Sequence, residues 1–149
     1  MKKVFMAALI LFLATNIRCV CAGEYTFSGY GAADESRMCT VSFSVDELSS
    51  EVVVTFRFMN TGMAPIKGDP FSSLKVEIVS TDGKTHAVTC YSDEGTSEDD
   101  SVQAIKPGDA VEKVLFNNDP AIQTIIMSKR IDHVIFYSDM GKFVLRQRQ

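Results

Sequence analysis

The stretch Glu51–Asn60 constrains the fold of this chain more than any other part of its sequence. Val52, Val54, Phe56 and Phe58 share one face of an extended chain here, and Val53, Thr55, Arg57 and Met59 share the other. β-branched and aromatic residues fit a pleated, half-buried surface, and Asn60-Thr61-Gly62 then supplies residues that favour a turn. The pattern predicts a β-strand of the core that ends at this turn.

The first 22 residues have the pattern of a secretory signal peptide. Two lysines precede an apolar run over residues 4–17, and Ala22 stands directly before an expected cleavage at Gly23. About fourteen apolar positions fall short of the roughly 20 that span a bilayer, so we expect no transmembrane anchor. The prediction is a secreted or periplasmic domain over residues 23–149, with a lipid anchor on Cys19 or Cys21 as the alternative.

Removal of the signal peptide would leave an acidic domain with two cysteines, Cys39 and Cys90. Two cysteines in an exported domain predict one disulfide, and two buried free thiols are the alternative. The chain has 15 basic and 19 acidic residues, and cleavage would leave 12 basic residues against the same 19. Because most non-specific nucleic-acid binding depends on basic charge, we expect no nucleic acid among the partners.

Short alternating segments separated by turn residues continue along the rest of the chain. We expect further strands over residues 25–30, 37–45, 74–79, 86–91, 102–105, 110–116, 131–138 and 143–146. Asp119 and Pro120 predict the start of a short helix that places Ile122, Ile125 and Ile126 on one side, with another strand as the alternative. The spacing predicts a single all-β, antiparallel domain of seven to nine strands, arranged as a β-sandwich.

The length of the turn after residue 80 follows from the alternation of its flanking strands. A two-residue loop at Asp82-Gly83 would place charged side chains on the same face as an inward Cys90. A three-residue loop over residues 81–83, with Gly83 left-handed, pairs Ile78 with His86 and Val76 with Val88 instead. We therefore predict three residues.

Several motifs from Glu51 to the C-terminus resemble the immunoglobulin-like domains common in exported bacterial proteins of unknown function. They are VVVTFRFMNTG over residues 52–62, Pro65-Ile66, LKVEIVSTDGK over 74–84, IKPGD over 105–109 and HVIFYSD over 133–139. The resemblance implies an immunoglobulin-like β-sandwich that serves as a stand-alone envelope or adhesion module. It brings no family active site with it.

The residues needed for catalysis or for metal binding form no recognisable set. His86 and His133 both alternate within expected strands, so no nucleophile, base and orienting group can be assembled, and we predict neither an enzyme nor a cofactor. Five carboxylates lie close together in one acidic stretch: Asp93, Glu94, Glu98, Asp99 and Asp100. Carboxylate oxygens suit Ca²⁺, but Gly95 does not match EF-hand spacing, so a solvated loop is the preferred interpretation and a calcium site the alternative.

Met63, Ile66 and Phe71 place apolar side chains in a proline-containing loop, which makes this loop a candidate for partner binding. The alternative for Phe71 is to cap the core. We predict a non-catalytic binding or adhesion module that contacts a protein or glycan in the envelope or outside the cell. The alternative function is a secreted inhibitor that blocks a hydrolase by inserting a loop, either residues 62–71 or residues 93–100. The oligomeric state stays open.

Overall fold

The structure, a computed structural model, describes residues 22–92 and 104–147, and it is all-β apart from one short helix. The elements are β1 (Ala22–Tyr30), β2 (Arg37–Val45), β3 (Val52–Asn60), β4 (Lys75–Ser80), β5 (Thr85–Val88), β6 (Ala110–Asn117), α2 (Pro120–Met127), β7 (Ile131–Ser138) and β8 (Gly141–Gln147). The predicted all-β, antiparallel fold of seven to nine strands is confirmed. Of the strand expected over residues 102–105, Ile105 forms an isolated bridge with Ile66.

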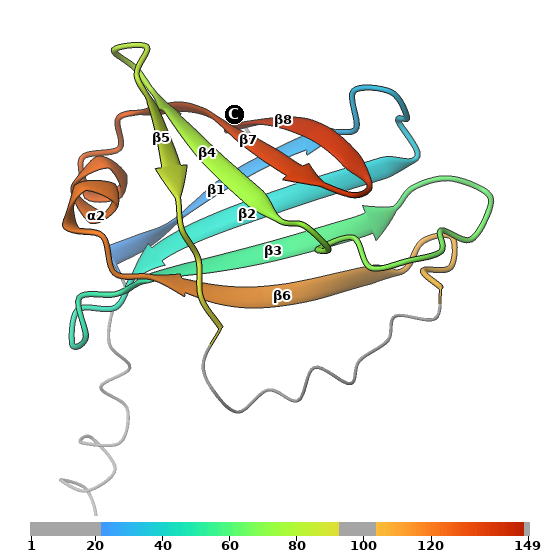
Figure 1. Cartoon of the computed structure of the whole chain (residues 1–149), viewed down its shortest axis with the longest axis horizontal. Coiled ribbons are helices and arrows are strands. Elements are labelled where there is room, and N and C mark those ends of the chain that lie inside the picture. The colour runs from blue at the N-terminus through green and yellow to red at the C-terminus, as the bar shows by residue number, and fades with distance from the viewer. Residues whose placement is uncertain (1–21, 93–103, 148–149) are drawn as a thin grey trace, which may run out of the picture.

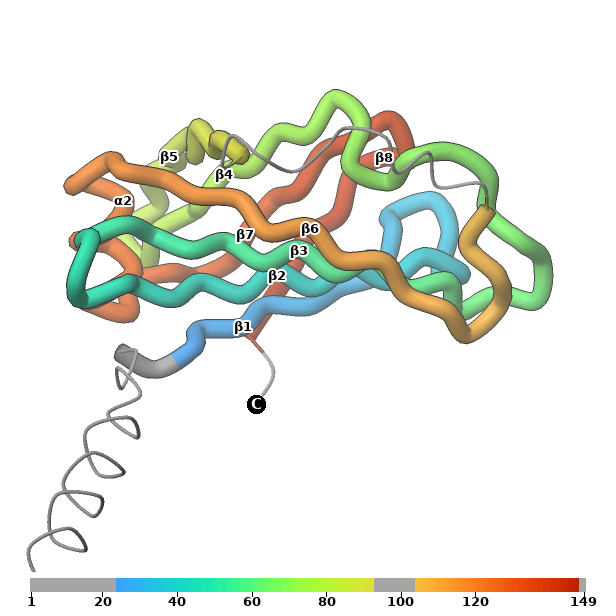
Figure 2. Tube along the Cα trace, turned by 90° about the horizontal axis from the view of Figure 1, so that it is seen from below, coloured from blue at the N-terminus to red at the C-terminus, as the bar shows by residue number. Residues whose placement is uncertain are grey.

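The eight strands form one continuous antiparallel sheet in the order β5-β4-β7-β8-β1-β2-β3-β6. The sheet curls, so that β4 and β7 cross over β1 and β2 (Figure 1, and from below in Figure 2). The chain just after the outer strand β5 approaches the other outer strand, β6, where Tyr91 exchanges two backbone hydrogen bonds of 2.9 Å with Phe116. The immunoglobulin-like arrangement of two sheets stays a prediction.

The core fills the space inside the curl and is built largely of phenylalanine. Phe56 on β3 packs on Phe136 of β7 with 5.9 Å between ring centroids, and Phe58 packs on Phe143 of β8 at 6.0 Å. All four rings are fully buried. Val52, Val54, Phe56 and Phe58 have no exposed surface, which confirms the inward face predicted for this strand. The aromatic contacts therefore join the two halves of the curled sheet across its interior.

The turn between β4 and β5 has the predicted three residues. Val76 pairs with Val88 and Ile78 with His86, while the Ser80 N–H donates to the Lys84 carbonyl at 2.9 Å. Gly83 has a φ of 83°, a left-handed conformation that glycine adopts without a Cβ clash. Side-chain parity alone was thus enough to determine the register of this hairpin.

Helix α2 covers one end of the curled sheet. Asp119 accepts a hydrogen bond from the Ala121 N–H at 2.8 Å, Pro120 opens the first turn, and Ile122, Ile125 and Ile126 are buried. This confirms the predicted helix and its apolar side. We call this end of the sheet the helix end (Figure 1). The part of the chain that the structure describes holds no helix with the length and apolar character needed to span a bilayer.

Candidate functional site

Four connections gather at the end of the sheet opposite α2, which we call the loop end (Figure 1). They are residues 31–36 between β1 and β2, 61–74 between β3 and β4, 104–109 before β6, and 139–140 between β7 and β8. Antiparallel strands alternate in direction, so every second connection returns to the same end. The loop end contains the predicted binding loop.

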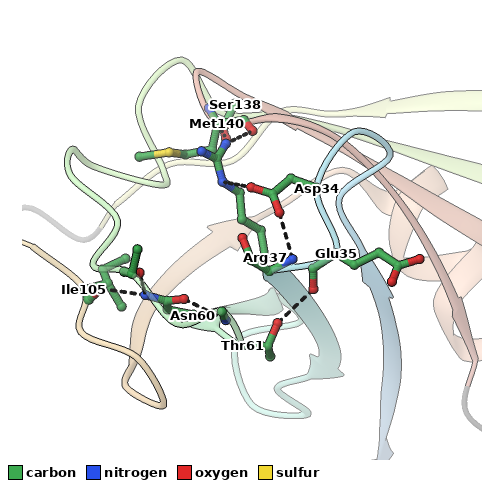
Figure 3. Close-up of polar contacts among 11 residues, drawn as sticks. Asp34, Glu35, Arg37, Asn60, Thr61, Ile105, Ser138 and Met140 are labelled. Carbon is green, nitrogen blue, oxygen red and sulfur yellow. Dashed lines mark hydrogen bonds and ion pairs between the residues drawn. The ribbon is translucent and has the colours of Figure 1, made fainter.

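Asn60, the last residue of β3, is the hydrogen-bonding centre of the loop end. It has no exposed surface, and its Nδ2 donates to the Ala64 carbonyl at 2.8 Å and to the Ile105 carbonyl at 2.9 Å (Figure 3). Its Oδ1 accepts a hydrogen bond from the Gly62 N–H at 2.9 Å. A buried amide with these partners holds the backbone on which it acts, because the amide itself would be buried without partners if the loop moved away.

The segment over residues 61–66, which we call the Met63 loop, is also held from both sides. The Thr61 N–H donates to the Ser36 carbonyl at 2.8 Å, and the Thr61 hydroxyl donates to the Glu35 carbonyl at 2.9 Å. At the other end of the loop, Ile66 and Ile105 exchange two backbone hydrogen bonds of 2.9 and 2.8 Å. The loop is therefore ordered by its neighbours before any partner arrives.

Met63 is the exposed tip of this loop. Its exposed fraction is 97%, whereas Ile66 is 8% and Phe71 is 7% exposed. Of the three apolar residues proposed for partner binding, only Met63 is exposed: Phe71 packs on Phe56, as the alternative for it predicts, and Ile66 belongs to the core. The Met63 backbone makes no hydrogen bond within the described part of the chain. The loop thus offers one apolar side chain and a backbone that is available to a partner.

Arg37 links the β1–β2 connection to the β7–β8 connection. Its Nη1 donates to the Met140 carbonyl at 2.8 Å, and its Nε lies 3.4 Å from the Asp34 carboxylate (Figure 3). Hydrogen bonds from Ser36 lower the pKa of Asp34, and the Arg37 charge lowers it further. An open groove of about 510 Å³ runs between the β1–β2 connection and the Met63 loop. It is lined by Asp34, Ser36, Arg37 and residues 62–67. The two loops therefore form one surface with a shallow hollow between them.

Cys39 and Cys90 are both free thiols, so the expected disulfide is absent. Cys39 pairs with Phe58 on β3, and Phe58 pairs with Val111 on β6, so Cys39 lies level with Val111 along the sheet. Tyr91, the residue after Cys90, pairs with Phe116 of the same strand β6. Five residues of strand separate these levels by about 17 Å. A disulfide requires Cα atoms within about 7 Å. Both side chains do contact the core, as predicted, but at different ends of the sheet.

Both thiols are expected to resist alkylation in the folded protein. Burial raises the pKa of Cys39 to about 12 and that of Cys90 to about 11. Because the thiolate is the nucleophile, both should react slowly at pH 8 and rapidly in concentrated urea. In the folded protein Cys90 should react first as the pH rises, since its pKa is lower. Thiol counting with an aromatic disulfide reagent checks this, and one fast-reacting thiol at pH 8 would contradict it.

The raised pKa values of the two thiols also make the stability of the folded protein depend on pH. The unfolded chain loses these thiol protons near pH 8.5, whereas the folded chain keeps them until about pH 11 to 12. Their contribution is fully present below pH 8.5 and declines as the pH rises through the folded values.

Neither histidine joins a catalytic arrangement with its described neighbours. His133 Nδ1 lies 2.6 Å from the Asp132 carboxylate on the outer surface of β7. His86 Nε2 lies 3.4 Å from the Ser80 hydroxyl, which donates to Asp82. In a Ser-His-Asp triad the imidazole stands between the hydroxyl and the carboxylate, and here the hydroxyl stands between them. These contacts order the β4–β5 turn.

The predicted calcium alternative, Asp93, Glu94, Glu98, Asp99 and Asp100, lies outside the described residues. Within residues 22–92 and 104–147, no three His, Cys, Asp or Glu side chains gather where they could hold a metal ion.

The role of Asn60 was missed in the sequence, although a signal for it exists. Asn60 continues the alternation of Val52, Val54, Phe56 and Phe58, so it falls on the inward face. A polar residue at an inward position must find hydrogen-bond partners there. The turn signal of Asn60-Thr61-Gly62 by itself does not indicate this role.

Comparisons with known proteins identify no relative. No family model matches the chain, and no curated protein or solved structure matches it.

Proposed function

We propose that the chain is exported and that its domain is a non-catalytic binding module, secreted or periplasmic, that contacts a protein through the Met63 loop. The observation that carries this proposal is the 97% exposure of Met63 on a loop held by Asn60. Ordering a loop normally costs free energy on association, and a loop that is already ordered avoids much of that cost. An exposed thioether side chain suits an apolar protein pocket better than a glycan.

The partner test compares two apolar side chains that are both almost fully exposed. Leu48 is 87% exposed in the turn between β2 and β3, at the helix end, and serves as the matched control for Met63. Immobilised wild type, Met63→Asp and Leu48→Asp proteins are incubated with envelope extract, and the retained proteins are quantified. We expect Met63→Asp to retain at least about ten-fold less of a specific partner, because a buried unpaired charge costs more than 1.4 kcal/mol. Equal retention by wild type and Met63→Asp would overturn the proposal.

Export has its own test. The intact mass of the exported protein should correspond to a chain that begins at Gly23. After native isolation, that chain should contain two free thiols. A retained Cys19 or Cys21 that carries lipid would replace the soluble module with an anchored one.

A second candidate, a secreted inhibitor that blocks a hydrolase, is supported by one feature of the Met63 loop. Asn60 bonds to the residues on both sides of Met63, so the loop would keep its shape when pressed into a cleft. An inhibitor of this kind abolishes the activity of its partner at a one-to-one ratio, whereas an adhesion module leaves that activity intact. A titration of the captured partner separates the two candidates.

A further inference from the structure

We propose that the Met63 loop is a substrate-like loop that inhibits serine endopeptidases whose specificity pocket accepts an unbranched apolar side chain. Met63 would fill that pocket, and the Met63–Ala64 peptide bond would lie at the nucleophile. This inference rests on the inhibitor candidate above and adds to it the class of enzyme, the bond and the specificity residue.

The surroundings of the loop select this bond over the one before it. A Cβ on Gly62 would lie 2.6 Å from the Ser36 Cβ, so Gly62 is packed closely against the first connection. The Gly62 N–H is already bonded to Asn60. Ala64 and Pro65 are exposed, and the Met63 carbonyl accepts no hydrogen bond from the described residues. The accessible bond is therefore the one that follows Met63.

The class of enzyme follows from the position of the single large side chain. Enzymes of the chymotrypsin and subtilisin type read chiefly the residue that precedes the cleaved bond, through one deep pocket. Met63 is that residue for the accessible bond, and the residues next to it, Gly62 and Ala64, are small. The free Met63 carbonyl is the group that an oxyanion hole binds. One exposed side chain on a free backbone matches this mode of recognition.

The bonds of Asn60 explain why such a loop would inhibit the enzyme instead of being consumed. Attack by the serine oxygen on the Met63 carbonyl forms an ester bond to Met63, and the Ala64 amine takes the proton and leaves. Asn60 still holds the Ala64 carbonyl at 2.8 Å, and the Ile66–Ile105 bridge holds the next residues. The amine therefore stays beside the ester and re-forms the peptide bond, which competes with hydrolysis by water.

The experiment uses the mature protein and three purified enzymes as probes: subtilisin, chymotrypsin and trypsin. We expect the wild type to inhibit subtilisin and chymotrypsin and not trypsin, whose pocket requires a basic side chain. Met63→Lys should gain inhibition of trypsin and lose at least about 100-fold in affinity for chymotrypsin, because the apolar pocket of chymotrypsin would then hold an unpaired charge. Leu48→Lys is the matched control and should behave as the wild type. Thermal unfolding followed by circular dichroism verifies that all variants fold.

The outcomes separate this inference from the proposed function. Absence of inhibition of both subtilisin and chymotrypsin overturns the inference, and so does rapid cleavage after Met63 without inhibition. An inhibition profile that does not change in Met63→Lys overturns it as well. In each of these cases, partner capture that still depends on Met63 would leave the binding module standing. Capture that does not depend on Met63 overturns the proposed function itself.

Discussion

Replacing Asn60 with alanine is expected to lower the free energy of unfolding by about 3 kcal/mol. The change removes a fully buried amide, leaves the Ala64 carbonyl and the Gly62 N–H without their partner, and takes one of two hydrogen bonds from the Ile105 carbonyl, which keeps the bond from the Ile66 N–H. Each buried group left unpaired costs about 1–3 kcal/mol, partly offset where the loosened loop lets water reach it. Urea unfolding followed by far-ultraviolet circular dichroism measures the loss.

The effect of Asn60 on the order of the Met63 loop has a matched control at the helix end. Asn117, the last residue of β6, is 2% exposed, donates to the Thr89 carbonyl at 2.9 Å and accepts from the Asp119 N–H at 3.0 Å. Asn117→Ala should also destabilise the protein, while leaving the Met63 loop ordered. Limited proteolysis under native conditions should cut the loop faster in Asn60→Ala only. Equal cutting in the two variants would show that Asn60 does not order the loop.

The second large effect is expected at Gly29 on β1, which lies directly against the backbone of β8. A Cβ at this position would lie 2.3 Å from the Val144 carbonyl oxygen and 3.2 Å from the Leu145 side chain. Because a backbone atom cannot move aside as a flexible side chain can, Gly29→Ala must push the two strands apart. We expect a loss of about 2 to 3 kcal/mol in the free energy of unfolding.

This loss should exceed the loss at the adjacent position, where no backbone atom lies so close. Ser28 is the adjacent residue on β1, is half-buried and pairs with Arg146 on the same neighbouring strand. Ser28→Ala should change stability by less than about 0.5 kcal/mol. A similar small change in Gly29→Ala would mean that β1 and β8 can separate without cost. Calorimetric melting curves of both variants provide the comparison.

The secondary structure of this chain was largely predictable because local patterns determine it. The alternation over residues 37–45 predicted β2 with its observed bounds, and residues 131–138 likewise predicted β7. The turn at Gly83 and the cap at Asp119 depend on neighbours a few residues away, so their residue types were sufficient. The candidate site was predictable only as a loop with an apolar tip.

Contacts between distant strands were the part that local patterns could not supply. Alternation placed Cys39 and Cys90 on inward faces, yet it contains no information on their level along the sheet, and they lie at different ends. Phe71 and Ile66 carry the same apolar character as Met63, and only the packing of Phe71 on Phe56 and the bridge to Ile105 separate them. Burial of a loop residue depends on what folds over it.

The sequence by itself determined that this chain forms short antiparallel strands, because a period of two and well-placed turn residues act over a few neighbours. Only the tertiary structure decided that these strands make one curled sheet, that Asn60 is buried and hydrogen-bonded at the loop end, and that Met63, unlike Ile66 and Phe71, is exposed. The physical reason is that pairing of the neighbouring strands β2, β3 and β6 brings together residues that lie far apart in the chain, such as residues 36, 64 and 105. The hydrogen bonds that order the loop exist only after these strands have paired.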